Sequence, residues 1–143
     1  MPTISITRTF AAPPDRVFDA WLDPEQFATW FGGSAGEIPL ETVRIDPTVG
    51  GTWAATMFAG PDRFEINWKG RYLALDRPSH LAFTLTDVEE EGEPTTVDLT
   101  ATADGGTSMA FRQTSPHMTD EQGEQTAAGW GTFFDALAAI VEA

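Results

Sequence analysis

The sequence predicts one α+β domain, in which a curved antiparallel sheet of about six to seven strands carries two short helices and a long C-terminal helix. Three observations predict it: an alternating strand followed by two proline-led helical segments, a middle part of short strands separated by turns, and an amphipathic C-terminal helix. The 143 residues are the usual size of a single domain, so we expect residues 1–143 to form one.

The N-terminal third contains one strand and two short helices. Apolar and polar residues alternate over residues 3–10, which is typical of a strand with one buried face. Pro14 suits the first turn of a helix, and apolar residues follow it at helical spacing. The Asp23-Pro24 pair ends this helix and begins another, which stops at the two glycines of residues 32–33.

The middle of the chain consists of strands and turns. The clearest alternation of apolar and polar residues runs over residues 64–72. Glutamates crowd residues 89–93, which we interpret as a hairpin tip. Turn signals lie at residues 46–47, 50–51, 60–62, 77–79 and 104–106. Turns at this spacing indicate antiparallel neighbours, and a sheet of this length must twist and curl, which gives it a concave face.

A long helix ends the chain, and it is the natural filler of that concave face. Thr119 or Asp120 can cap its N-terminus, and apolar residues then recur at helical spacing up to Val141. Gly129 and Gly131 lie inside the pattern, although glycine disfavours a helix. Either another element approaches closely at these glycines, or the regular helix begins after them.

Composition excludes several classes of function. There is no cysteine, which excludes disulfides and thiolate metal sites, and the two histidines form no recognisable metal motif, so we predict no metal and no cofactor. The net charge of −14 predicts no nucleic-acid partner and no membrane partner, because both are polyanionic. Residues 1–10 do not have the pattern of a signal peptide, so we expect a cytoplasmic location.

Four short motifs, in the order of the chain, resemble one known family. The segments FATWF over residues 27–31, IDPTVGGTW over 45–53, GRYLALDRPSHLAFT over 70–84 and Gly129-Trp130 are similar to motifs of proteins related to the C-terminal domain of the activator of Hsp90 ATPase. The resemblance spans nearly the whole chain. It implies membership of the START-like, or Bet v 1-like and polyketide cyclase-like, superfamily with its helix-grip fold.

The resemblance implies a deep cavity between the sheet and the last helix, because members of that superfamily bind lipids, polyketides and other apolar molecules there. We therefore expect the partner to be a small apolar molecule. Aromatic and apolar residues on the strands and the last helix are the candidate lining, and Gln113 is the candidate for orienting a ligand. The candidate set is Trp30, Trp53, Phe58, Ile66, Trp68, Tyr72, Phe83, Met109, Phe111, Gln113, Trp130, Phe133 and Phe134.

Three functions remain open from the sequence. The leading hypothesis is binding of a small hydrophobic ligand, and the same residues could equally be plain core. The second is a cyclase-type or hydrolase-type enzyme acting on such a ligand, in which Tyr72, Glu65 or Gln113 moves a proton. The sequence does not favour catalysis, because no nucleophile-and-base arrangement is visible. The third is a chaperone-associated interaction module, and homodimerisation is open in all three.

Overall fold

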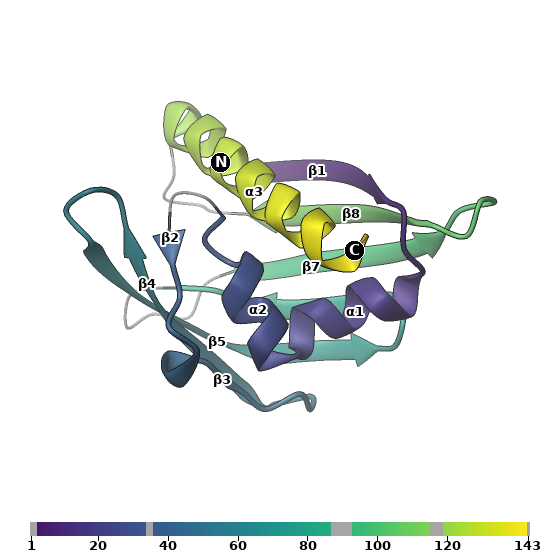
Figure 1. Ribbon diagram of the computed structural model, residues 1–143, viewed down its shortest axis with the longest axis horizontal. Helices are drawn as coiled ribbons and strands as arrows, with labels where there is room; N and C mark the ends of the chain where they lie inside the picture. The colour runs from purple at the N-terminus through teal and green to yellow at the C-terminus, as the bar shows by residue number, and fades with distance from the viewer. Residues whose placement is uncertain (1–2, 34–35, 87–92, 115–118, 143) are drawn as a thin grey trace.

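The computed structural model describes residues 3–33, 36–86, 93–114 and 119–142. It confirms the α+β fold class, with one antiparallel sheet and three helices (Figure 1). The elements in chain order are β1 (Thr3–Phe10), α1 (Pro14–Leu22), α2 (Pro24–Trp30), β2 (Gly36–Glu37), a 3-10 turn (Leu40–Thr42), β3 (Arg44–Ile45), β4 (Thr52–Ala59), β5 (Phe64–Asp76), β6 (His80–Thr84), β7 (Pro94–Ala101), β8 (Thr107–Thr114) and α3 (Asp120–Val141).

The sheet runs in the order β1-β8-β7-β6-β5-β4-β2, and β3 also pairs with β4. Its eight strands include the two-residue strands β2 and β3, and these account for the excess over the expected six to seven. All three helices lie on the same face of the curved sheet, and α3 crosses it diagonally (Figure 1). The core is therefore the layer between the helices and this inner face of the sheet.

Strand β5 joins the two halves of the sheet, and Gly70 lies near the point where its pairing passes from β4 to β6. The first part of β5 pairs with β4 as far as Arg71, and its last part, from Tyr72 on, pairs with β6. The Trp53 indole N–H donates to the Thr84 carbonyl oxygen at 2.9 Å beside this glycine. A side chain at Gly70 would overlap that carbonyl oxygen, so this position requires glycine.

The N-terminus of α3 is capped by one of the two residues that the sequence predicts for this role. Thr119 caps α3, because its hydroxyl accepts from the backbone N–H of Gln122 while the Gln122 side chain accepts from the Thr119 N–H. Helix α3 then continues without a break through Gly129 and Gly131. Both explanations offered for these glycines were wrong: the helix begins nine residues before Gly129, and a β-carbon at either glycine would meet open space.

Two further predictions from the sequence concern Phe64 and the acidic hairpin tip, and only the first lies wholly within the described residues. The alternation over residues 64–72 predicts an inward Phe64, but its side chain is 67% exposed where β5 leaves the β4–β5 hairpin. The acidic hairpin tip lies outside the described residues except for Glu93.

No helix in the described part of the chain combines the length and the apolar character that a membrane-spanning helix needs.

Replacing Gly129 or Gly131 with alanine should stabilise the protein. Each change should raise the free energy of unfolding by about 1 kcal/mol, because alanine favours the helix and the new methyl group meets no atom. Urea denaturation followed by circular dichroism measures this. A loss of stability would show that α3 needs glycine at these positions, and it would contradict the open space beside them.

Gly70→Ala should do the opposite and destabilise the protein by about 3 kcal/mol or more, because a methyl group has no space beside the Thr84 carbonyl and the Trp53 indole. The same urea titration measures it, with Gly131→Ala as the matched control for the chemical change. Equal behaviour of the two variants would contradict the proposed role of Gly70.

Candidate functional site

Aromatic rings from the sheet and from all three helices form one connected interior cluster. Trp21 of α1 contacts Trp30 of α2, with ring centroids 4.7 Å apart, and it stacks toward Phe111 of β8 at 6.5 Å. Phe111 contacts Trp130 of α3 at 4.6 Å. Aromatic pairs at these separations add to the stability that burial alone provides, so the cluster holds the helices on the sheet.

The structure brings twelve of the thirteen candidate residues to this interior. Nine are buried: Trp30, Trp53, Tyr72, Phe83, Met109, Phe111, Gln113, Trp130 and Phe134. Three more pack against the same core but remain half-buried: Ile66, Trp68 and Phe133.

Phe58 faces the other side of the sheet. Trp53, Ala55 and Met57 are the inward positions of β4, so the odd spacing places Phe58 outward, where the Arg63 guanidinium carbon lies 4.9 Å from the centroid of its ring. Glu65 pairs with Phe58 in the register and is exposed, so it does not face the interior either. Strict counting of the alternation from Trp53 would have excluded Phe58.

Phe31, which was not among the candidates, lies beside two of the half-buried candidates, Trp68 and Phe133. We call this part of the interior its half-buried end. The Phe31 ring centroid is 5.3 Å from Phe133, 5.8 Å from Trp130 and 6.5 Å from Trp68. We call these four residues the Phe31 cluster. Phe31 directly follows α2, at its C-cap, and it is buried. Helical spacing assigned it only to the apolar face of α2, and its sequence position gives no sign that it reaches both β5 and α3.

Gln113 links the sheet to α3. It lies on the same face of β8 as Met109 and Phe111, and its Oε1 accepts a hydrogen bond of 2.9 Å from the indole N–H of Trp130. This buried bond fixes the position of Trp130 over the sheet, because an indole N–H in the core needs an acceptor.

The interior between α1, α2 and the sheet is nearly filled. The cavity left there measures about 10 Å³, which is about the size needed for one water molecule. Its walls are Trp21, Phe27, Phe31, Trp53, Tyr72, Leu81 and Phe83. The aromatic side chains of this region thus serve as core.

Tyr72 is the buried titratable side chain of this region. Burial raises the pKa of its hydroxyl far above the ordinary value, and the negative charge of Asp46 raises it further. The hydroxyl therefore stays protonated at neutral pH and can act only as a hydrogen-bonding group. Within the described residues, no three His, Asp or Glu side chains come together in a way that could hold a metal ion.

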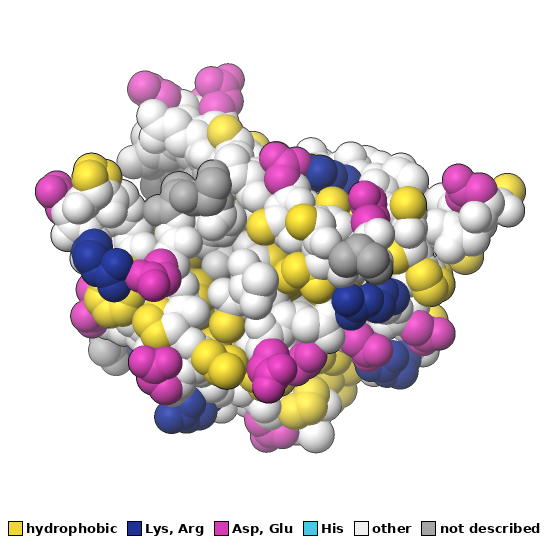
Figure 2. All heavy atoms as spheres, in the orientation of Figure 1, with side chains coloured by type: hydrophobic (Ala, Val, Ile, Leu, Met, Phe, Trp, Pro, Cys, Tyr) yellow, Lys and Arg dark blue, Asp and Glu magenta, His cyan; other side chains and the backbone are white. Residues whose placement is uncertain are grey.

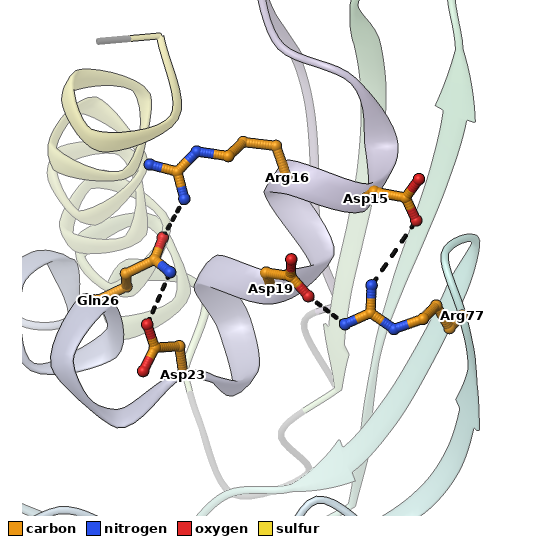
Figure 3. A network of polar contacts seen from close by, with 6 residues as sticks. All are labelled: Asp15, Arg16, Asp19, Asp23, Gln26 and Arg77. Carbon is orange, nitrogen blue, oxygen red and sulfur yellow. Dashed lines mark hydrogen bonds and ion pairs between the residues drawn. The ribbon is translucent and has the colours of Figure 1, made fainter.

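A separate open recess of about 540 Å³ lies between the α1–α2 pair and the end of β5, where Leu75 and Arg77 face Phe18 and Asp19 across it. Arg77, which follows β5, pairs with Asp19 and lies 3.6 Å from Asp15 (Figure 3). In the same view Gln26 bridges Arg16 and Asp23. The charged groups here tie α1 to α2 and to the β5–β6 turn, so this network has a structural role.

Known proteins share this architecture over the whole chain. A protein from Chromobacterium violaceum is 27% identical, with a TM-score of 0.85 over 99% of this chain and 97% of that one. The AHSA1-like protein from Aeromonas hydrophila is 24% identical (TM-score 0.78, 99% and 92% covered), and the AHSA1 protein from Silicibacter pomeroyi is 21% identical (TM-score 0.78, 99% and 98% covered). The last two likenesses, under 25% identity, show the fold alone.

A comparison with curated proteins finds no match to this chain. A family model matches residues 11–142, which is nearly all of it. The fold, the order of the motifs and this match agree with the resemblance seen in the sequence. The chain belongs to the family of activator of Hsp90 ATPase homolog 1-like proteins.

Proposed function

We propose that this protein binds a small apolar molecule at the Phe31 cluster, between β5 and α3. One observation carries the proposal: Trp68 and Phe133 stay half-buried, whereas Phe31 and Trp130 between them are buried. The membership of the family supports it, because its helix-grip fold places a helix over a concave sheet.

The chemistry of this surface suits an apolar ligand. Trp68 lies next to Phe31, and Phe31 lies next to Phe133, so the three rings form a continuous apolar strip from the sheet to the helix. Ile66 extends it along the inner face of β5, opposite Met57. Covering apolar area gains about 25 cal/mol per Å², so a ligand that covers the exposed parts of Trp68 and Phe133 is stabilised without any change in the core.

No specific observation favours the enzyme alternative. Of the three residues considered for proton transfer, Glu65 faces outward, the Gln113 oxygen already accepts from Trp130, and Tyr72 is held protonated by burial. General acid–base catalysis is most efficient when the pKa of the group lies near the operating pH, and none of these three side chains provides such a group in the interior. A ligand-binding role needs no such group.

The interaction-module alternative also lacks a supporting surface. The large apolar side chains exposed in the described residues are Leu40, Val49 and Phe64, which belong to three different segments. Hydrophobic side chains on the face shown in Figure 2 are interspersed with acidic and basic ones. A docking surface for a protein usually has a contiguous apolar patch. The cytoplasmic location and the state of oligomerisation stay predictions.

An uncharged apolar dye, N-phenyl-1-naphthylamine, should bind saturably with a stoichiometry of one. Phe133→Ala should weaken it by about tenfold, because the ligand loses the contact with one aromatic ring. Fluorescence titration measures the dissociation constant. Phe58→Ala, which removes a half-buried phenylalanine from the opposite face of the sheet, is the matched control and should leave binding unchanged. No saturable binding, or equal effects of the two variants, would contradict the proposal.

A further inference from the structure

The indole N–H groups of the five tryptophans fall into two kinds. Three have an acceptor: Trp30 donates to the Ala20 carbonyl at 2.8 Å, Trp53 to Thr84 and Trp130 to Gln113, both at 2.9 Å. The other two, on Trp21 and Trp68, are buried and have no partner among the described residues.

An unmatched buried donor needs an explanation. Leaving one without an acceptor costs about 1–3 kcal/mol, and native proteins leave few of them. Trp21 lines the cavity of about 10 Å³, which is about the size needed for one water molecule. Trp68 does not line that cavity. Its ring belongs instead to the half-buried strip, next to Phe31.

The inner face also carries a second unmatched polar group. The Thr95 hydroxyl is buried without a partner among the described residues, and Thr95 is only 1% exposed. In the register of the sheet it lies opposite Gln113, whose oxygen already accepts from Trp130. The inner face therefore holds buried polar groups as well as rings.

We infer that the ligand is uncharged and carries a hydrogen-bond acceptor, such as a carbonyl or ether oxygen, that receives the Trp68 indole N–H. This inference rests on the proposed function and names the chemical class of the ligand at the same site. It predicts an oxygenated aromatic or polycyclic molecule. The bond to Trp68 orients it, and the rings of the Phe31 cluster provide the contact area.

The distribution of charge excludes a carboxylate as that acceptor. Lys69 and Arg71 alternate with Trp68 on β5 and so point to the outer face, as Arg112 does beside Gln113. Arg8 of β1 pairs with Asp135 of α3 at 2.6 Å. A carboxylate beside Trp68 would thus be desolvated without a cation in a protein of net charge −14. A fatty acid that enters carboxylate first does not fit this site.

Three probes of nearly equal shape test the inference: 1-ethylnaphthalene, the ketone 1-acetonaphthone and the anion 1-naphthoate. Dissociation constants from equilibrium dialysis should rank the ketone about tenfold tighter than the hydrocarbon, with the anion weakest. Trp68→Phe keeps a ring and removes the N–H, so it should abolish the advantage of the ketone over the hydrocarbon. Trp21→Phe removes the other unmatched N–H and should not change the ratio.

The outcomes separate the two proposals. Equal affinity for ketone and hydrocarbon in the wild-type protein, or a ratio that Trp68→Phe leaves intact, overturns the inference while ligand binding stands. Tightest binding of 1-naphthoate also overturns it. If none of the three probes binds, the proposed function fails together with the inference.

Discussion

The hydrogen bond from the Trp53 indole to the Thr84 carbonyl, beside the backbone of Gly70, joins the two halves of the sheet, because it ties β4 to β6 across β5. It lies where β5 passes from pairing with β4 to pairing with β6. The sheet is curved, and α1, α2 and α3 cover its concave face. Trp68, two residues before Gly70 and on the same face of β5, lies against Phe31 there.

The interior then divides into a filled part and a half-open end. Near α1 and α2 the aromatic rings pack until about 10 Å³ remains, and their role is stability. Near α3 the bond between Trp130 and Gln113 holds the helix in place, while Trp68 and Phe133 stay half-buried. Neighbouring residues of one cluster can therefore have different roles. The buried rings of Phe31 and Trp130 stabilise the fold, and they fix the positions of Trp68 and Phe133, which remain accessible to a ligand.

Local patterns in the sequence were enough to predict the fold class and the order of the elements, and twelve of the thirteen candidate residues do reach the interior. These patterns failed where a position depends on contacts distant in sequence. Phe58 has the residue type of a lining residue, but the alternation from Trp53 turns it outward. Phe31 has no special local signature, and its role appears only when β5 and α3 meet around it. Whether an indole N–H finds an acceptor is likewise a property of the assembled core.

The most direct test of ligand binding beside Trp68 is an NMR titration of the five indole N–H signals with 1-acetonaphthone. We predict a downfield shift of the Trp68 signal as its unmatched N–H gains an acceptor, while the signals of Trp30 and Trp53 keep their positions because their hydrogen bonds are already made. A Trp68 signal that does not move at saturating ligand, or shifts confined to other tryptophans, would contradict the account.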